Sequence, residues 1–167
     1  MQTMKAVVAY ATVAAVGSSA CARRIPEPAG LAPGTPHVSW IIMRGDRDNP
    51  DRDFVCQSDR RNDCVLPASR PNAPVFSDVH IYYHGTGVET KYTGSIQIGF
   101  FQGSADETHT VQVDRTVPKT ESIVNQSITD DVTVTPGNYA ITFALVATLT
   151  DTGKTQPIRE QVPVVVK

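Results

Sequence analysis

The chain has 167 residues, with 15 basic and 17 acidic side chains, and its formal net charge is −2 at pH 7. This length fits one ordinary domain together with an additional segment. Because the chain has no basic surplus to neutralise phosphates, the composition argues against nucleic acid as a partner.

The N-terminal segment has the pattern of a signal peptide. A short region with one positive charge, Lys5, precedes an apolar run from Ala6 to Val16, and small residues follow up to Cys21. The run is too short to cross a bilayer, which takes about 20 apolar residues. We therefore expect residues 1–20 to direct export and to be removed from the mature chain.

The cysteine that ends this segment is a candidate for lipidation. The tripeptide Ser-Ala-Cys that ends at Cys21 resembles the end of a bacterial lipobox, although Ser18 stands where an aliphatic residue is usual. Ordinary small-x-small cleavage around Ala20 is the alternative. Lipidation of Cys21, or cleavage beyond it, leaves Cys56 and Cys64 as an even pair. We favour a lipid anchor on Cys21 at a membrane surface of the cell envelope, with a soluble periplasmic or secreted protein as the alternative.

The residues after the signal divide into a tether and a domain. Residues 21–36 include four prolines and show no apolar period, which is typical of a linker. We expect the domain to occupy residues 37–167 and to begin with a strand from His37 to Met43.

The segment from Arg44 to Asp63 is unusually charged, with five arginines and six aspartates in twenty residues. It is too charged for a core and too long for a common turn, so we interpret it as a charged loop. Long loops on rigid sandwiches often carry recognition. Four of its arginines are therefore candidate binding residues: Arg47, Arg52, Arg60 and Arg61.

The charged segment also contains candidates for a disulfide and for a cation site. Cys56 and Cys64 are expected to form a disulfide, because an exported chain meets an oxidising compartment and their spacing does not match a zinc site. The carboxylates that could attract calcium are Asp46, Asp48, Asp51 and Asp53. Their spacing departs from that of an EF-hand and nearby arginines neutralise their charge, so we predict a solvated, salt-bridged loop and no metal site.

From residue 73 on, apolar and polar residues alternate, which indicates half-buried strands. The segments 76–84 and 91–101 are separated by a loop of hairpin length with two glycines, so we predict that they pair as a hairpin. The polar face of the first segment includes His80, Tyr82 and His84, and that of the second includes Lys91, Thr93, Ser95 and Gln97. The three aromatic side chains are candidate contacts for a sugar or a protein, although an ordinary solvent face would have the same composition.

Further strands are expected at residues 108–113, 123–128, 131–135, 139–149 and 158–166, and no segment has a helical period. Pro163 cannot donate to a ladder, so the last strand should lie at an edge or contain a bulge. Gly137-Asn138-Tyr139, which opens a late strand, resembles the "tyrosine corner" of immunoglobulin-like and fibronectin-type sandwiches. Seven or eight short strands at regular spacing predict an all-β sandwich or barrel. The resemblance implies the first of these, a single antiparallel immunoglobulin-like β-sandwich.

The sequence contains no motif of a known catalytic class. His37 and His109 are isolated, and no cofactor is implied. We therefore expect a non-catalytic envelope lipoprotein that binds a protein or glycan partner. A structural accessory subunit of an envelope assembly and, less favoured, a secreted hydrolase are the alternatives.

Overall fold

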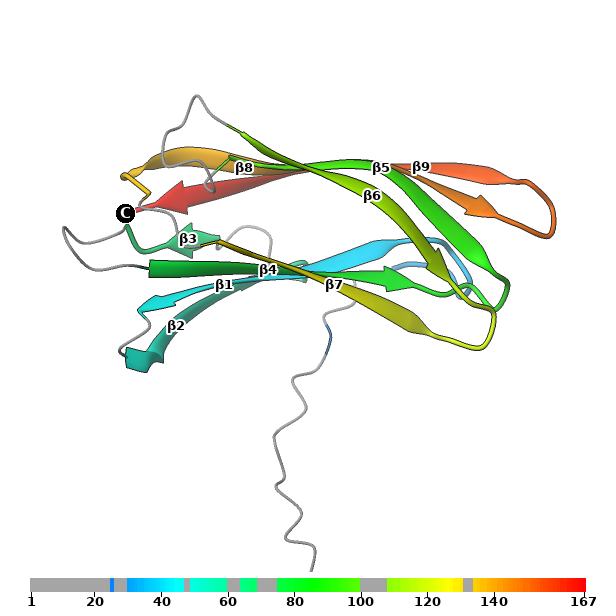
Figure 1. Cartoon of the computed structure of the whole chain (residues 1–167), viewed down its shortest axis with the longest axis horizontal. Helices are drawn as coiled ribbons and strands as arrows, with labels where there is room; N and C mark the ends of the chain where they lie inside the picture. The colour runs from blue at the N-terminus through cyan, green and yellow to red at the C-terminus, as the bar shows by residue number, and fades with distance from the viewer. Residues whose placement is uncertain are drawn as a thin grey trace, which may run out of the picture.

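The computed structural model describes residues 25, 30–46, 49–59, 64–68, 75–99, 108–130 and 134–167. These residues form an all-β structure of two sheets, which Figure 1 shows as two stacked layers. The four-stranded sheet has the order β2-β1-β4-β7, with the bounds Asn49–Gln57, Val38–Asp46, Val75–His84 and Ile123–Asp130. The five-stranded sheet has the order β3-β9-β8-β5-β6, with the bounds Val65–Leu66, Thr155–Val166, Gly137–Leu149, Thr90–Ile98 and His109–Val117.

The core lies between the two sheets and is built by the alternation that the sequence predicts. On β4, Val79, Ile81 and Tyr83 are fully buried, while the residues between them point to the outer face. The other large core side chains include Trp40, Tyr92, Phe143 and Ile96. Burying apolar side chains of this size stabilises a fold by roughly 1.5–3 kcal/mol each. The interior-facing residues therefore account for the association of the two sheets.

The predicted hairpin between β4 and β5 is wrong. β4 pairs with β1 and β7, whereas β5 pairs with β6 and β8 in the opposite sheet. The connection from Gly85 to Glu89 carries the chain across the core, and the rings of Tyr83 and Tyr92 pack 5.3 Å apart between the sheets. Alternation shows which face of a strand is apolar, but it does not show whether the next strand lies beside it or opposite it.

The predicted charged loop is also wrong over much of its length. Residues Asn49–Gln57 form β2, which pairs antiparallel with β1, so that Asp46 stands opposite Asn49. β2 lies at the edge of its sheet and has a partner on one side only. Edge strands commonly carry charged residues, which discourage pairing with other chains. The high charge therefore marks an edge strand rather than a loop.

The remaining strands agree with the expectation except in two places. Val134 and Thr135, at the end of the strand expected over residues 131–135, are not in a strand, and residues 131–133 lie outside the described part. The two-residue strand β3, which sequence reasoning missed, pairs parallel with β9 through Val65 and Val165. The described residues thus form nine strands, one pairing of which is parallel. β3 pairs with β9 only at Val165 and Val166, so at Pro163 the strand β9 has a partner on the β8 side alone. This agrees with the predicted place of Pro163 at an edge.

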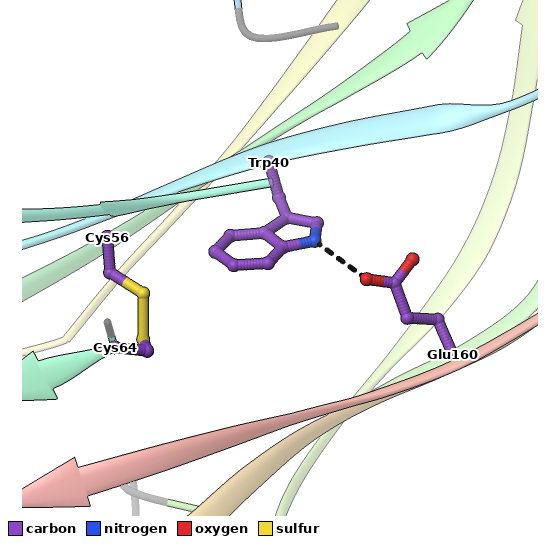
Figure 2. Close-up of a disulfide and its surroundings, with 4 residues drawn as sticks. All are labelled: Trp40, Cys56, Cys64 and Glu160. Carbon is purple, nitrogen blue, oxygen red and sulfur yellow. Dashed lines mark hydrogen bonds between the residues drawn. A yellow bond between two sulfur atoms is a disulfide. The ribbon is translucent and has the colours of Figure 1, made fainter. Parts of the chain in front are cut away.

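The disulfide between Cys56 and Cys64 is present, with 5.1 Å between the two Cα atoms, and both residues are buried. It joins the end of β2 to the residue that precedes β3, so it ties together strands of different sheets. The side chain of Trp40 projects from β1 into the same region, where its Nε1 donates a hydrogen bond of 3.3 Å to Glu160 Oε1 from β9 (Figure 2). This bond satisfies the indole N–H and explains a carboxylate on the inner side of β9.

Tyr139 bonds to the backbone of the chain just before β8. Its hydroxyl donates a hydrogen bond of 2.9 Å to the carbonyl oxygen of Thr135, four residues upstream, and the residue is 7% exposed. The bond satisfies a buried hydroxyl and fixes the chain where it enters β8.

Candidate functional site

The outer face of the four-stranded sheet carries a hydrogen-bonded cluster centred on Asp78. Its Oδ2 lies 2.7 Å from His80 Nε2, while its Oδ1 accepts hydrogen bonds from Ser127 Oγ at 2.7 Å and from Thr129 Oγ1 at 3.1 Å. The register between β4 and β7 places these hydroxyls opposite His80 and Asp78. The carboxylate is thus held by three groups and fixes the orientation of the imidazole.

An aromatic ring and an aliphatic residue are further neighbours of this imidazole. Tyr82 stacks along the strand, with 6.4 Å between the ring centroids, and Ile41 stands opposite His80 on β1 and is 2% exposed. The Nδ1 atom of His80 is buried and has no hydrogen-bond partner. His80 and Tyr82 are both partly exposed on the outer face, as the alternation predicts. The polar cluster is therefore shallow and offers little free hydrogen-bonding capacity.

His84, the third aromatic candidate on this strand, is not at the surface. It is 5% exposed, so the prediction that its side chain faces solvent is wrong. His37, which precedes β1, stacks on His84 with 4.0 Å between the ring centroids, and the Nε2 atom of His84 lies 2.7 Å from Ser39 Oγ. The chain segment before β1 covers the end of β4, which a strand pattern alone does not reveal. His84 thus belongs to the packing at this end of the sandwich.

Ser39 and His84 have the distance of a nucleophile and its general base. Ser39, however, is 0% exposed, and the buried hydroxyl of Tyr92 donates to the carbonyl oxygen of His84 at 2.6 Å. A substrate could not reach the serine oxygen without opening the packed end of the sandwich. The pair is a satisfied, buried hydrogen bond, the ordinary state of polar groups in a core.

The outer face of the five-stranded sheet is broad and polar. Lys91, Thr93, Ser95 and Gln97 of β5 lie on it, as the alternation predicts, although they belong to the sheet opposite His80. The register aligns uncharged hydrogen-bonding side chains in one row across four strands: Gln161, Thr142, Gln97 and Thr110. The row combines one residue from each of four strands, so it could not be predicted from any one strand.

A hollow of about 390 Å³ lies beside this row, near the start of β8. Its lining includes Gln97, Gly99, Thr108, Asn138, Ala140, Thr142 and Gln161, and Tyr139 contributes to its wall. Among the described lining residues none is a carboxylate, a histidine, a lysine or an arginine. Sequence reasoning missed this site, although the outward alternation on β5, β8 and β9 places each polar side chain on the same face.

The remaining candidates lie mostly outside the described residues. Arg47, Arg60, Arg61 and Asp48 are outside them, and Arg52, Asp51 and Asp53 belong to β2, with Asp46 at the end of β1. β2 extends between Arg47 and the two later arginines in the sequence, so the four are not consecutive members of one loop. Within the described residues, no group of three or more His, Cys, Asp or Glu could hold a metal ion.

A comparison with protein-family models found no match, and neither did comparisons with curated proteins and with solved structures. In the described part of the chain, no helix has the length and apolar character needed to cross a bilayer.

Proposed function

We propose that this chain is a non-catalytic binding module of the cell envelope, exported by its N-terminal signal and held at a membrane surface by a lipid on Cys21. The observation that carries the proposal is the rigid outer face of the five-stranded sheet, with its row of uncharged hydrogen-bonding side chains beside a hollow. Such a face can bind a polar protein or glycan surface without catalysing a reaction.

The disulfide supports the exported location. Structural disulfides persist in oxidising compartments and are rare in the cytosol. Cys56 and Cys64 are both 3% exposed and join strands of the two sheets, which is the placement of a structural bond rather than a redox-active one. Lipidation or removal of Cys21 would leave these two thiols fully paired.

We also propose that the sandwich is of the immunoglobulin-like class. The order β1-β4-β7 facing β9-β8-β5-β6 corresponds to the strands A-B-E and G-F-C-C′ of such sandwiches. In this correspondence β8 is strand F, the strand on which a tyrosine corner is expected, and Tyr139 lies near its start. Two features depart from antibody domains, since Trp40 is on β1 and the disulfide does not join strands B and F.

The burial of Ser39 supports a binding role over a hydrolase. Its hydroxyl lies 2.7 Å from His84 Nε2, but Ser39 is 0% exposed and His84 is 5% exposed, so a substrate cannot reach either side chain. The hollow is accessible, but its described lining offers no group that could act as a general base near neutral pH.

The anchor is tested with the full chain expressed in a bacterial host that processes lipoproteins. Cys21→Ser should release the protein from the membrane fraction or stall its processing, and mass spectrometry of the wild-type N-terminus should show a lipid-modified cysteine. Ser18→Leu, which restores the usual lipobox residue, is the matched control and should leave the protein anchored.

An unmodified N-terminus at Arg23 in the wild-type protein would contradict the lipid anchor. In protein taken from the envelope, Cys56 and Cys64 should resist alkylation. Free thiols at both positions would contradict export, because the same bond should form wherever the compartment is oxidising.

A further inference from the structure

We propose that the hollow beside Ala140 is a binding site for an uncharged saccharide. This inference rests on the proposed binding role and gives it a site and a ligand class. The hollow is formed where the end of β5 and the start of β8 meet Thr108, which precedes β6, with Gln161 of β9 on its far side. Its volume of about 390 Å³ falls within the usual range of small-molecule sites, roughly 300–1,000 Å³.

The shape of the hollow follows from the size of the residue at its floor. Ala140 projects outward from β8 between longer side chains, because Asn138 and Thr142 flank it along the strand. Gln97 on β5 and Gln161 on β9 are both paired with Thr142, so their amides border the same depression from opposite sides. A methyl group among amides leaves open space above the sheet. The strands fix the backbone, so the depression exists before any ligand arrives.

The hydrogen-bonding groups around this floor are available for a ligand. Five polar side chains line it: Gln97, Thr108, Asn138, Thr142 and Gln161. Within the described residues, no hydrogen bond or ion pair joins any of these side chains to another group of the protein. Each amide offers two donors and an acceptor, and each hydroxyl offers both. A ligand that presents donors and acceptors on every side therefore matches the hollow, and the hydroxyls of a sugar ring do so.

The absence of charge among the described lining residues favours an uncharged ligand. A phosphate or carboxylate ligand would be expected to meet arginine or lysine, which bind such groups most strongly. Arg159, two residues before Gln161 on β9, does not line the hollow. An anionic sugar would thus lose its water without gaining an ion pair to any of the described lining residues.

A peptide fits the same hollow less well. Peptide and protein partners depend on aromatic or aliphatic anchors that enter apolar pockets. Here the floor offers only the methyl group of Ala140, and the ring of Tyr139 is 7% exposed with its hydroxyl already bonded to Thr135. Recognition must then come from hydrogen bonds, which suits a saccharide. Because no exposed aromatic ring is available for stacking in the described lining, the affinity should be modest.

The experiment titrates the full-length protein with neutral and charged probes and follows backbone amide signals by NMR. The neutral probes are chitotriose and maltotriose, the charged probe is trigalacturonate, and tetra-alanine is the peptide probe. We expect saturable shifts at Gln97, Asn138 and Thr142 with at least one neutral trisaccharide, and none with the other two probes.

The matched variants are Ala140→Leu and Ala144→Leu. Both alanines face outward from β8, but only Ala140 lines the hollow. Ala140→Leu should fill the floor and weaken saccharide binding by about tenfold or more, whereas Ala144→Leu should bind as the wild type does. Thermal unfolding of both variants checks that the fold is retained, and Gln97→Ala with Gln161→Ala supplies a second test that leaves β8 unchanged.

The outcomes separate this inference from the proposed function. No saturable shift with either neutral trisaccharide, or equal binding by Ala140→Leu and the wild type, would overturn the saccharide site. Binding of tetra-alanine or trigalacturonate in its place would overturn the ligand class. If the chain captures an envelope partner while both saccharides fail, the binding role stands and this site does not. If chitotriose binds while the protein is found in the cytoplasm, the site stands and the envelope role does not.

Discussion

Two buried tyrosines place hydroxyl groups in the core of the sandwich. Tyr92 donates hydrogen bonds to the carbonyl oxygens of His84 at 2.6 Å and of His37 at 3.3 Å, and Tyr83 donates to Gln126 Oε1 at 2.7 Å. Burial raises the pKa of Tyr92 to about 12, and it raises the pKa of Tyr83 further. Both hydroxyls are therefore expected to keep their protons well above pH 10 in the folded state.

This shift predicts a loss of stability at alkaline pH. An unfolded tyrosine ionises near pH 10, so between about pH 10 and 12 the unfolded chain loses the proton that folded Tyr92 retains. Stability from this group is complete below about pH 10 and falls as the pH rises toward 12, by at most about 1.4 kcal/mol per pH unit. Urea unfolding between pH 9 and 11 should show this slope. In Tyr92→Phe the part of the slope that Tyr92 contributes should disappear. An unchanged slope would contradict the raised pKa of Tyr92 as its cause.

At the scale of single residues, the sequence predicts which way a side chain points better than it predicts how exposed that side chain is to solvent. The inward direction of Val79, Ile81 and Tyr83 follows from alternation. The burial of His84 does not, because it depends on His37 stacking from another part of the chain. Alternation reports the two faces of a strand, whereas exposure also depends on what crosses over the strand end.

The strand β5 contains a glycine whose position requires it. Gly94 has a φ of +134° and pairs with both Val113 of β6 and Leu145 of β8. A Cβ at this position would lie 2.2 Å from the carbonyl oxygen of Ala144 and 3.0 Å from Leu145 Cα. Both contacts are to backbone, which cannot rotate away as a flexible side chain can.

Gly94→Ala should therefore lower the free energy of unfolding by about 3 kcal/mol, the sum of backbone strain and a clash within the sheet. Gly87→Ala is the matched control, because its φ is +86° but an added Cβ would meet nothing within 4 Å. This control should cost only about 1–2 kcal/mol. Denaturant unfolding of both variants measures the difference, and equal losses would show that β5 and β8 separate more easily than their register indicates.

At the scale of elements, most strands could be predicted, but their partners could not. β4 and β5 each show one apolar face, and a five-residue connection can either turn a hairpin or cross between sheets. β2 was missed because its charge resembles that of a loop, whereas an edge strand can carry charge along its solvent-facing positions. Pairing is decided by contacts between distant segments, which a local pattern does not contain.

In the whole molecule, the candidate surfaces are distributed over separate places. The cluster of Asp78 and His80 lies on the outer face of one sheet, and the saccharide hollow lies on the outer face of the other. The polar side chains of both faces could be predicted from the sequence. The prediction placed them on one face, however, because it paired β4 with β5, which belong to different sheets. The hollow itself needed the register of β5, β8 and β9, since its residues are brought together only by the sheet.

The predicted role of the arginines changes with this arrangement. β2 has nine residues, so at about 3.3 Å per residue its two ends are roughly 26 Å apart. Arg47 precedes the strand and Arg52 is within it, whereas Arg60 and Arg61 follow it, inside the segment closed by the disulfide. The four arginines should therefore act as two pairs. A disulfide-closed segment loses less conformational entropy on docking, so the later pair should contribute more to partner binding.

Capture of a protein partner from envelope extract can test this difference with variants of equal charge change. The double variant Arg60→Ser with Arg61→Ser should weaken capture more than Arg47→Ser with Arg52→Ser, and raising the salt concentration should reduce the difference. His80→Ser with Tyr82→Ser should matter less, because these side chains are partly buried and His80 is already bonded to Asp78. His84 is left unchanged, since its burial would confound binding with stability.

Loss of capture only in the His80 and Tyr82 variant would move the site to the four-stranded sheet. Equal capture by all three would favour a structural accessory whose partner contacts lie elsewhere.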